Sequence, residues 1–186
     1  MPYPSQITLE TILQTARQMI EAAGVDHVSL RGLARELGVK APSLYRYVSS
    51  KEALLRALNE ETSAAIVQSI LDAAPSDTKL ETRLLTLAHA YRRFAEENPA
   101  TYELLFSNRV NELRPDEATQ EESVLPLQAL FAEWGGAENS LAALRGAWAF
   151  LHGWVMLEIA GQFRRGGDLD KHFETAFRAY LAGCKR

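Results

Sequence analysis

The sequence contains a single cysteine, Cys184, so no disulfide can form within the chain. It also lacks an apolar run long enough to cross a bilayer, which requires about 20 residues. The longest such run, 147–160, is interrupted by His152 and Glu158. The first residues lack the basic start and apolar stretch of a secretory signal. We therefore expect a cytoplasmic protein with no membrane partner.

The usual sequence signs of catalysis and metal binding are also missing. None of the four histidines, at positions 27, 89, 152 and 172, has a second histidine or a cysteine one helical turn away. There is no Gly-x-Ser-x-Gly elbow, no phosphate-binding glycine loop and no Cys/His arrangement for nucleophilic catalysis. The sequence therefore predicts no enzyme, no metal site and no cofactor.

Basic residues are outnumbered by acidic ones, 20 against 24, which by itself argues against a nucleic-acid partner. The balance changes along the chain. Residues 1–58 hold seven Lys or Arg and five Asp or Glu, whereas residues 59–186 hold 13 and 19. A DNA backbone would attract the first part and repel the second. The asymmetry would therefore orient the N-terminal part toward DNA.

Apolar residues recur at helical spacing almost throughout, and no segment has the alternation of a strand. An all-α fold of about nine helices is predicted, at approximately 12–23, 30–37, 42–48, 52–70, 80–95, 99–106, 117–135, 140–163 and 169–182. A polar, acidic stretch at 108–122 reads as a loop that becomes the seventh helix. We expect a three-helix domain at 1–55 and a helical bundle at 56–186.

Local signals set several of these helix ends. Gly24 is suited to ending the first helix in a left-handed conformation, and Ser29 is placed to cap the second. Ser49 and Glu52 have the spacing of a capping box and are predicted to open the fourth helix. The short third helix begins at Pro42, where the missing N–H costs nothing.

Residues 29–51 have the form of a helix-turn-helix, whose second helix lies in the major groove. Gly38 supplies the turn, and apolar residues such as Leu33, Leu44 and Val48 would hold the two helices together. The remaining side chains are free to meet double-stranded DNA. The predicted DNA-binding residues are Arg31, Lys40, Ala41, Pro42, Ser43, Tyr45, Arg46, Tyr47 and Lys51.

At these positions the sequence resembles the TetR (tetracycline-repressor-like) family. The resemblance rests on Val28-Ser29, Leu33-Ala34, Leu37-Gly38-Val39, Ser43-Leu44-Tyr45, Tyr47-Val48 and Lys51. It implies a homodimer that binds a roughly palindromic operator, with Arg31, Ser43, Tyr45, Tyr47 and Lys51 contacting DNA. Many relatives have Gly or Thr in place of Pro42 and His in place of Tyr47, so the base preference does not carry over.

The second part of the chain resembles a C-terminal type of this family named for its Trp, His and Gly. Trp148, His152 and Gly153, together with the segment 96–106, carry that resemblance. The two resemblances imply that 1–55 is a DNA-binding domain and 56–186 a ligand-binding and dimerisation domain, with a small-molecule pocket among the fourth to eighth helices. Pockets are mostly apolar with a few polar groups, so an apolar or aromatic effector is expected. The candidate pocket residues are Tyr91, Tyr102, Phe106, Trp148 and His152; the alternative is that they are ordinary core residues.

The eighth predicted helix is apolar almost all round, so it must be covered on two sides. We expect the eighth and ninth helices to form a four-helix dimer interface, with Trp154, Phe173, Phe177 and Tyr180 as candidate contacts. The alternative is a wholly internal helix. The leading functional hypothesis is a repressor released from DNA by its effector. A carrier or enzyme whose head has lost DNA binding is the second, and an activator cannot be separated from a repressor.

Overall fold

The computed structural model describes residues 7–73, 75, 77–107, 113, 115 and 117–185. These residues contain helices and no strand, which confirms the predicted all-α class. The packing divides the chain into two compact units. We call them the head (residues 1–63 and 98–117) and the body (64–97 and 118–186). The predicted acidic loop begins at residue 108, and most of its residues before Glu117 lie outside the described part of the chain.

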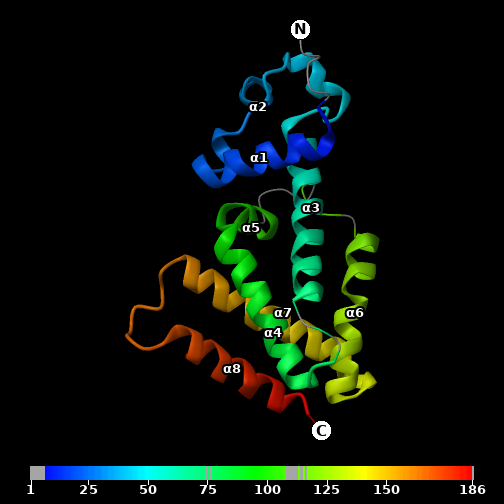
Figure 1. Cartoon of the computed structure of the whole chain (residues 1–186), viewed down its shortest axis with the longest axis vertical. Helices are drawn as coiled ribbons and strands as arrows, with labels where there is room; N and C mark the ends of the chain where they lie inside the picture. Colours follow the sequence, from blue (N-terminus) through cyan, green and yellow to red (C-terminus); the bar gives the residue numbers. More distant parts are fainter. Residues whose placement is uncertain are drawn as a thin grey trace. The chain divides into compact units, whose positions relative to one another are not determined.

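The head is built around a helix-turn-helix (Figure 1). Its elements are α1 (Leu9–Ala23), η1 (Val25–His27), α2 (Leu30–Glu36), η2 (Ala41–Arg46), the first part of α3 (Lys51–Asp72) and α5 (Pro99–Phe106). Apolar side chains from these elements form one core, which includes Ile12, Leu33, Leu44, Leu54 and Leu104. The membership of α5 was not anticipated, because residues 98–117 are distant in sequence from the predicted domain at 1–55.

Two details of the head differ from the prediction. The third helix is a 3-10 helix over Ala41–Arg46 in place of an α-helix over 42–48. Its bonds span three residues, from Ser43 N–H to the Lys40 carbonyl and from Tyr47 N–H to the Leu44 carbonyl, as is common in such short segments.

The predicted capping box of the fourth helix is also wrong. The cap of α3 is Ser50, whose hydroxyl accepts from the Ala53 N–H at 3.1 Å, so the helix begins one residue later than Ser49 would place it. By contrast, Ser29 caps α2 as predicted, accepting from the Gly32 N–H.

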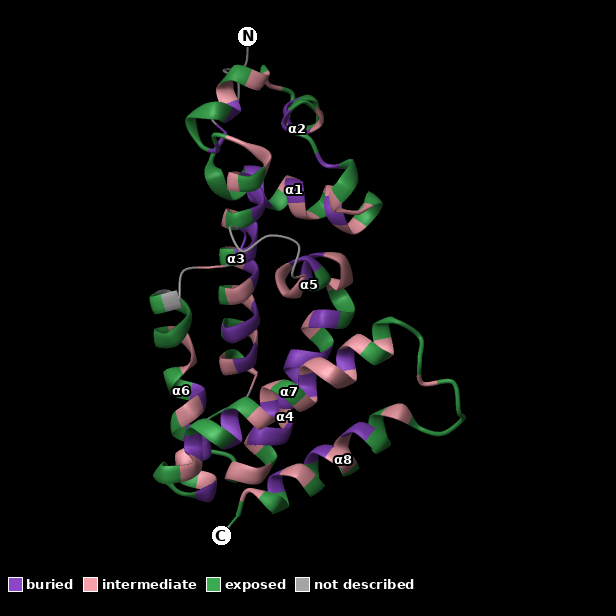
Figure 2. Ribbon diagram, turned by 180° about the vertical axis from the view of Figure 1, so that it is seen from behind, coloured by how far each residue is buried: buried purple, intermediate pink, exposed green. Residues whose placement is uncertain are grey.

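The body contains the remainder of α3 together with α4 (Leu80–Glu97), α6 (Glu117–Gly135), η4 (Ala137–Asn139), α7 (Ser140–Ile159) and α8 (Leu169–Gly183). Helices α4, α7 and α8 pack on one another, and their buried residues line the faces they share (Figure 2). All nine predicted helices thus have a counterpart, the third in η2 and the others in α1–α8. None of the helices in the described residues is long and apolar enough to cross a membrane.

Helix α7 is shorter than predicted, because it stops at Ile159 and not at residue 163. Gly161 has a φ of +63°, a conformation that favours glycine. The Gln162 N–H donates to the Leu157 carbonyl and the Gly161 N–H to the Glu158 carbonyl. This pair of bonds is the Schellman motif, which satisfies the last carbonyls and ends the helix.

Candidate nucleic-acid interface

A tight turn orients η2 against α2. Gly38 adopts a φ of +67°, and the Val39 N–H donates to the Ala34 carbonyl at 2.9 Å. The side chains between the two helices, among them Leu33 and Leu44, are fully buried. The orientation of η2 is therefore fixed by apolar packing on one side, which leaves its opposite side in solvent.

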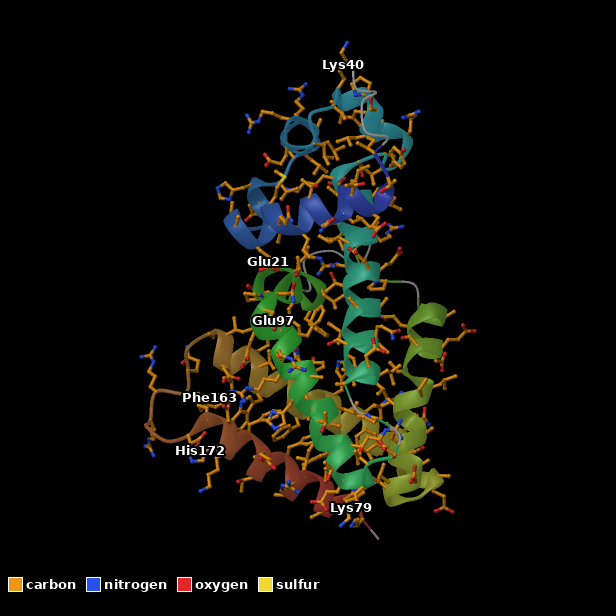
Figure 3. The ribbon with its side chains drawn as sticks, in the orientation of Figure 1. Glu21, Lys40, Lys79, Glu97, Phe163 and His172 are labelled. Atoms are coloured by element: carbon orange, nitrogen blue, oxygen red, sulfur yellow. The ribbon has the colours of Figure 1, made fainter. Side chains whose placement is uncertain are left out.

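The free side of η2 carries most of the residues predicted to bind DNA. Lys40, Pro42 and Arg46 are exposed, Tyr45 is 55% exposed, and Ala41 and Ser43 are half-buried. Figure 3 shows the Lys40 side chain extending from the head into solvent. Basic and hydroxyl groups on an otherwise rigid surface can bind phosphates, while the tyrosine ring can contact base edges.

Helix α2 adds further positive charge beside this surface. Arg31 is exposed, as the prediction of a DNA contact requires. Arg35 lies one helical turn later and is also exposed, although sequence reasoning did not single it out. The signal was the spacing of four residues, which places two side chains on one face of a helix.

The other two predicted contacts are already engaged within the head. The Tyr47 hydroxyl donates to the Ile7 carbonyl at 2.6 Å, and the guanidinium of Arg46 lies 5.8 Å from the Tyr47 ring centre. The Lys51 ammonium donates to the Val25 carbonyl at 2.9 Å. A hydroxyl that donates to a carbonyl has no second proton for a phosphate, whereas an ammonium has two more. Lys51 can therefore bind an anion without losing this bond, and Tyr47 cannot do so through its hydroxyl.

A narrow apolar cavity of about 40 Å³ lies inside the body. Two of the five predicted pocket residues, Tyr91 and Trp148, line it, with their rings edge to face at 5.4 Å. The rest of the wall consists of residues that were not predicted to line a pocket, among them Phe177, which was predicted as a dimer contact: Ile70, Leu84, Leu87, Ala88, Leu127, Leu130, Phe131, Leu144, Ala147, Leu151 and Phe177. The wall therefore offers dispersion contacts and almost no hydrogen bonding.

The remaining candidate pocket residues lie elsewhere. Tyr102 and Phe106 belong to α5 in the head, where their rings are 4.8 Å apart. His152 is half-buried on α7 but is not part of the cavity wall. Burial lowers the pKa of His152 below its ordinary value, which favours the neutral imidazole.

The four residues predicted to meet a second subunit form contacts within the chain. Phe173 and Phe177 are buried, and Trp154 packs edge to face on Phe173 at 5.4 Å. The Tyr180 hydroxyl donates to the Ala143 carbonyl at 2.5 Å. These aromatics attach α8 to α7 inside one body, and Trp154 and Tyr180 are only half-buried, so their contact with a second subunit stays a prediction.

Comparison with known proteins gives the same picture over the whole chain. Residues 12–58 match the model described as bacterial regulatory proteins of the tetR family, and residues 84–180 match the tetracyclin repressor-like C-terminal domain. The chain is 30% identical over 179 residues to YobS of Bacillus subtilis, an uncharacterized HTH-type transcriptional regulator. That match covers 95% of this chain and 92% of YobS.

Two solved structures show the same fold. A protein of unknown function from Rhodococcus sp. RHA1 superposes with a TM-score of 0.80 at 25% identity, over 100% of this chain and 99% of that one. A TetR variant from Acinetobacter baumannii AYE in complex with minocycline superposes with a TM-score of 0.70 at 22% identity, over 96% of each chain. The Trp-His-Gly type is named by neither family description and stays a prediction. The chain belongs to the TetR family and is a DNA-binding transcriptional regulator of the helix-turn-helix kind.

Proposed function

We propose that this regulator is a homodimeric repressor that leaves a roughly palindromic operator when a small apolar or aromatic molecule enters its body. The observation that carries the proposal is the free side of η2, where exposed Lys40, Tyr45 and Arg46 stand on a rigid apolar core. In a helix-turn-helix protein this side enters the major groove. A protein acting on chromosomal DNA would work in the cytoplasm.

In this proposal the DNA contacts divide into two kinds. Arg31, Lys40 and Lys51 bind phosphates and set the register of the head, while Tyr45 and Arg46 reach base edges. The short side chains of Ala41, Pro42 and Ser43 lie close to the backbone of η2 and determine how closely η2 can approach the floor of the major groove. Tyr47 contributes its ring, because its hydroxyl is held by Ile7.

The outer face of α7 supports the dimer. Ala142, Ala149 and Gly153 share one face by helical spacing, and none of them is buried within the chain. A Cβ atom added to Gly153 would meet nothing within 4 Å. Small residues on an open helix face allow a second helix to approach closely, so a second copy of α7 and α8 fits there. Two heads in adjacent major grooves would then lie about 34–36 Å apart.

The dimer can be tested at Gly153, because the fold of the single subunit does not require a small residue there. Gly153→Leu should fold, because its Cβ has open space, but it should raise the dimer dissociation constant by about tenfold or more. Ala129→Leu, at an exposed site on α6, is the matched control. Sedimentation across a range of protein concentrations measures both variants, and equal dissociation constants would place the interface elsewhere.

The cavity supports an effector that is neutral and apolar, because an ion or strongly polar group would lose its hydration without finding partners. Its volume of about 40 Å³ is far below the roughly 300 Å³ of a typical ligand site. Binding must therefore displace the walls, which provides a coupling between ligand and conformation. A protein of the same fold, the Acinetobacter baumannii TetR variant, has been seen with minocycline.

The direct test of DNA binding is selection from a random duplex pool with the purified protein. The proposal expects an enriched sequence with two related half-sites in inverted orientation. Heptane-sized and aromatic hydrocarbons can then be screened for release of that duplex. Failure to enrich any sequence, with an intact fold, would overturn the repressor proposal and favour a carrier that has lost DNA binding.

A further inference from the structure

The carboxylate of Glu21, near the end of α1, is bonded to the first turn of α5. One oxygen, Oε2, accepts from the Ala100 N–H at 3.0 Å. The other, Oε1, accepts from the Thr101 N–H at 2.9 Å and from the Thr101 hydroxyl at 2.6 Å. Figure 3 shows Glu21 on the side of α1 that faces α5. One side chain thus joins two helices of the head that are far apart in sequence.

These bonds account for every N–H of that turn that the helix itself leaves free. Pro99 opens α5 and has no N–H, and the Tyr102 N–H donates to the Asn98 carbonyl at 2.9 Å. The Asn98 side chain makes no capping bond to the helix. The two remaining donors are the ones that Glu21 accepts. The N-terminal cap of a helix normally comes from the residue just before it, but the cap of α5 comes from Glu21 of α1.

The rest of the contact between α5 and its neighbours in the head is incomplete. Leu104 is buried in the head core. A groove of about 240 Å³ nevertheless runs between η1 and α5, lined by residues 23–27 on one side and by Ala100, Glu103, Leu104 and Ser107 on the other. The Glu21 cap therefore adds directional hydrogen bonds to an apolar contact that is open on one side.

The covalent order of the chain gives this cap a role in regulation. Helix α4 supplies Leu84, Leu87, Ala88 and Tyr91 to the cavity wall and ends at Glu97. Only Asn98 separates it from α5. A ligand that enlarges the cavity by displacing α4 must therefore move α5 or strain the link between them.

We propose that Glu21 is a positioning residue that fastens α5 to α1 and so passes a displacement of α4 to the DNA-binding head. The inference rests on the proposed function, because it assumes that a ligand enlarges the cavity. A cap of hydrogen bonds suits this role, since it is strong when intact and is lost over a displacement of about 1 Å. A broad apolar contact would yield more gradually.

The cap itself is tested by hydrogen exchange in the full chain. Glu21→Ala should accelerate amide exchange at Ala100 and Thr101 by about 5- to 30-fold, as expected for loss of a helix cap. Glu103→Ala removes an exposed carboxylate from α5 and is the matched control, with little change expected. Unchanged exchange at both amides in Glu21→Ala would overturn the proposal.

Transmission is tested by overfilling the cavity in place of an unidentified ligand. Ala88→Leu adds bulk to the α4 wall, where the side chain is buried. With Glu21 present, it should accelerate exchange in the last turn of α1 and weaken binding to a selected duplex by about tenfold. In the Glu21→Ala background the effect on α1 should vanish, and the change in DNA affinity should fall to about twofold or less.

Each arm has its own contradicting result. If Ala88→Leu alters α1 equally in both backgrounds, or alters it in neither, Glu21 does not transmit the displacement. If the wild-type protein binds no selected duplex, the proposed function fails, while hydrogen exchange still decides whether Glu21 couples the helices. Circular dichroism of every variant separates these outcomes from loss of the fold.

Discussion

Replacing Arg92 should destabilise the body far more than replacing an equally well-paired arginine on its surface. Arg92, on α4, binds both oxygens of Glu158 on α7 at 2.6 and 2.7 Å and reaches Asp170 on α8 at 2.7 Å. It also pairs with Glu96 at 3.0 Å and lies over the Phe173 ring. Its side chain is only 8% exposed. The pKa of Arg92 is raised, chiefly by its bonds to Glu158, so the charge persists at all working pH values.

The magnitude follows from what Arg92→Met leaves behind. Breaking a buried ion pair by removing one partner costs about 3–5 kcal/mol. The Glu158 side chain is 15% exposed and would stay unpaired, but Asp170 is 81% exposed and Glu96 44%, so water relieves part of the penalty. We therefore expect a loss of about 2–4 kcal/mol, which corresponds to a Tm lower by about 5–12 °C in a chain of this size.

Arg178 provides the control, because it also bonds two carboxylates, those of Glu81 and Glu174, but its side chain is 47% exposed. Arg178→Met should shift the Tm by no more than about 2 °C, since exposed ion pairs contribute little. Thermal unfolding at one fixed protein concentration measures both. Adding Glu158→Leu to Arg92→Met should recover stability, because the unpaired carboxylate is removed. Equal Tm losses for the two arginine variants, or no recovery, would refute the reasoning.

Three further predictions concern the packing of α7 at Gly146, the protonation of His152 and the hydrogen bond of Tyr47 in the head. Gly146→Ala should lower the Tm, because the new Cβ would lie 2.5 Å from the Tyr180 hydroxyl oxygen. In a Tyr180→Phe background the loss of Tm should be smaller, and equal losses in the two backgrounds would disprove this contact. The pKa of His152 is lowered by burial, so at mildly acidic pH the unfolded chain binds more protons than the folded one. The free energy of unfolding of the wild type should therefore fall as the pH drops through about 6.5. His152→Gln should flatten that decline in denaturant titrations at several pH values. Tyr47→Phe should cost about 0.5–1.5 kcal/mol of stability, because the bond to the Ile7 carbonyl is lost. Its affinity for a selected duplex should change by less than about threefold. A larger loss of affinity would show that the Tyr47 hydroxyl leaves Ile7 and binds DNA.

The fold was predictable wherever local chemistry decides it. Ser29 and Gly38 act through bonds and dihedral angles within a few residues of themselves, so their roles follow from the sequence. The choice between Ser49 and Ser50 as the cap of α3 depends on which of two adjacent positions the helix register selects, and the end of α7 depends on the hydrogen bonds around Gly161. Periodicity cannot resolve a difference of one residue, and helix ends are accordingly its weakest point.

The exposed side of η2 was also predictable, because a helix-turn-helix buries one side of a short helix and leaves the other free. The engagement of Tyr47 and Lys51 was not, since their partners Ile7 and Val25 are distant in sequence. The placement of Tyr102 on α5 in the head failed to follow from the sequence for the same reason, because α5 packs on and bonds to residues of α1 that are distant in sequence.

The aromatic stripe of α8 illustrates a different limit. Phe173 and Phe177 show that one face of the helix must be covered, but an amphipathic pattern does not say what covers it. The structure covers that face with α7 and α4 of the same chain. The dimer contact proposed above uses instead the small residues of α7 around Gly153, which are a less conspicuous feature of the sequence.

The central claim is that the head binds DNA through the free side of η2, and the salt dependence of binding tests it most directly. Fluorescence anisotropy with a selected duplex, at several salt concentrations, should show weaker binding for Lys40→Ala and a slope of log affinity against log salt reduced by about 1. Lys79→Ala removes an exposed lysine from the body and should leave affinity and slope unchanged. If Lys40→Ala matches the wild-type slope, or if both variants lose affinity alike, η2 is not the surface that meets DNA.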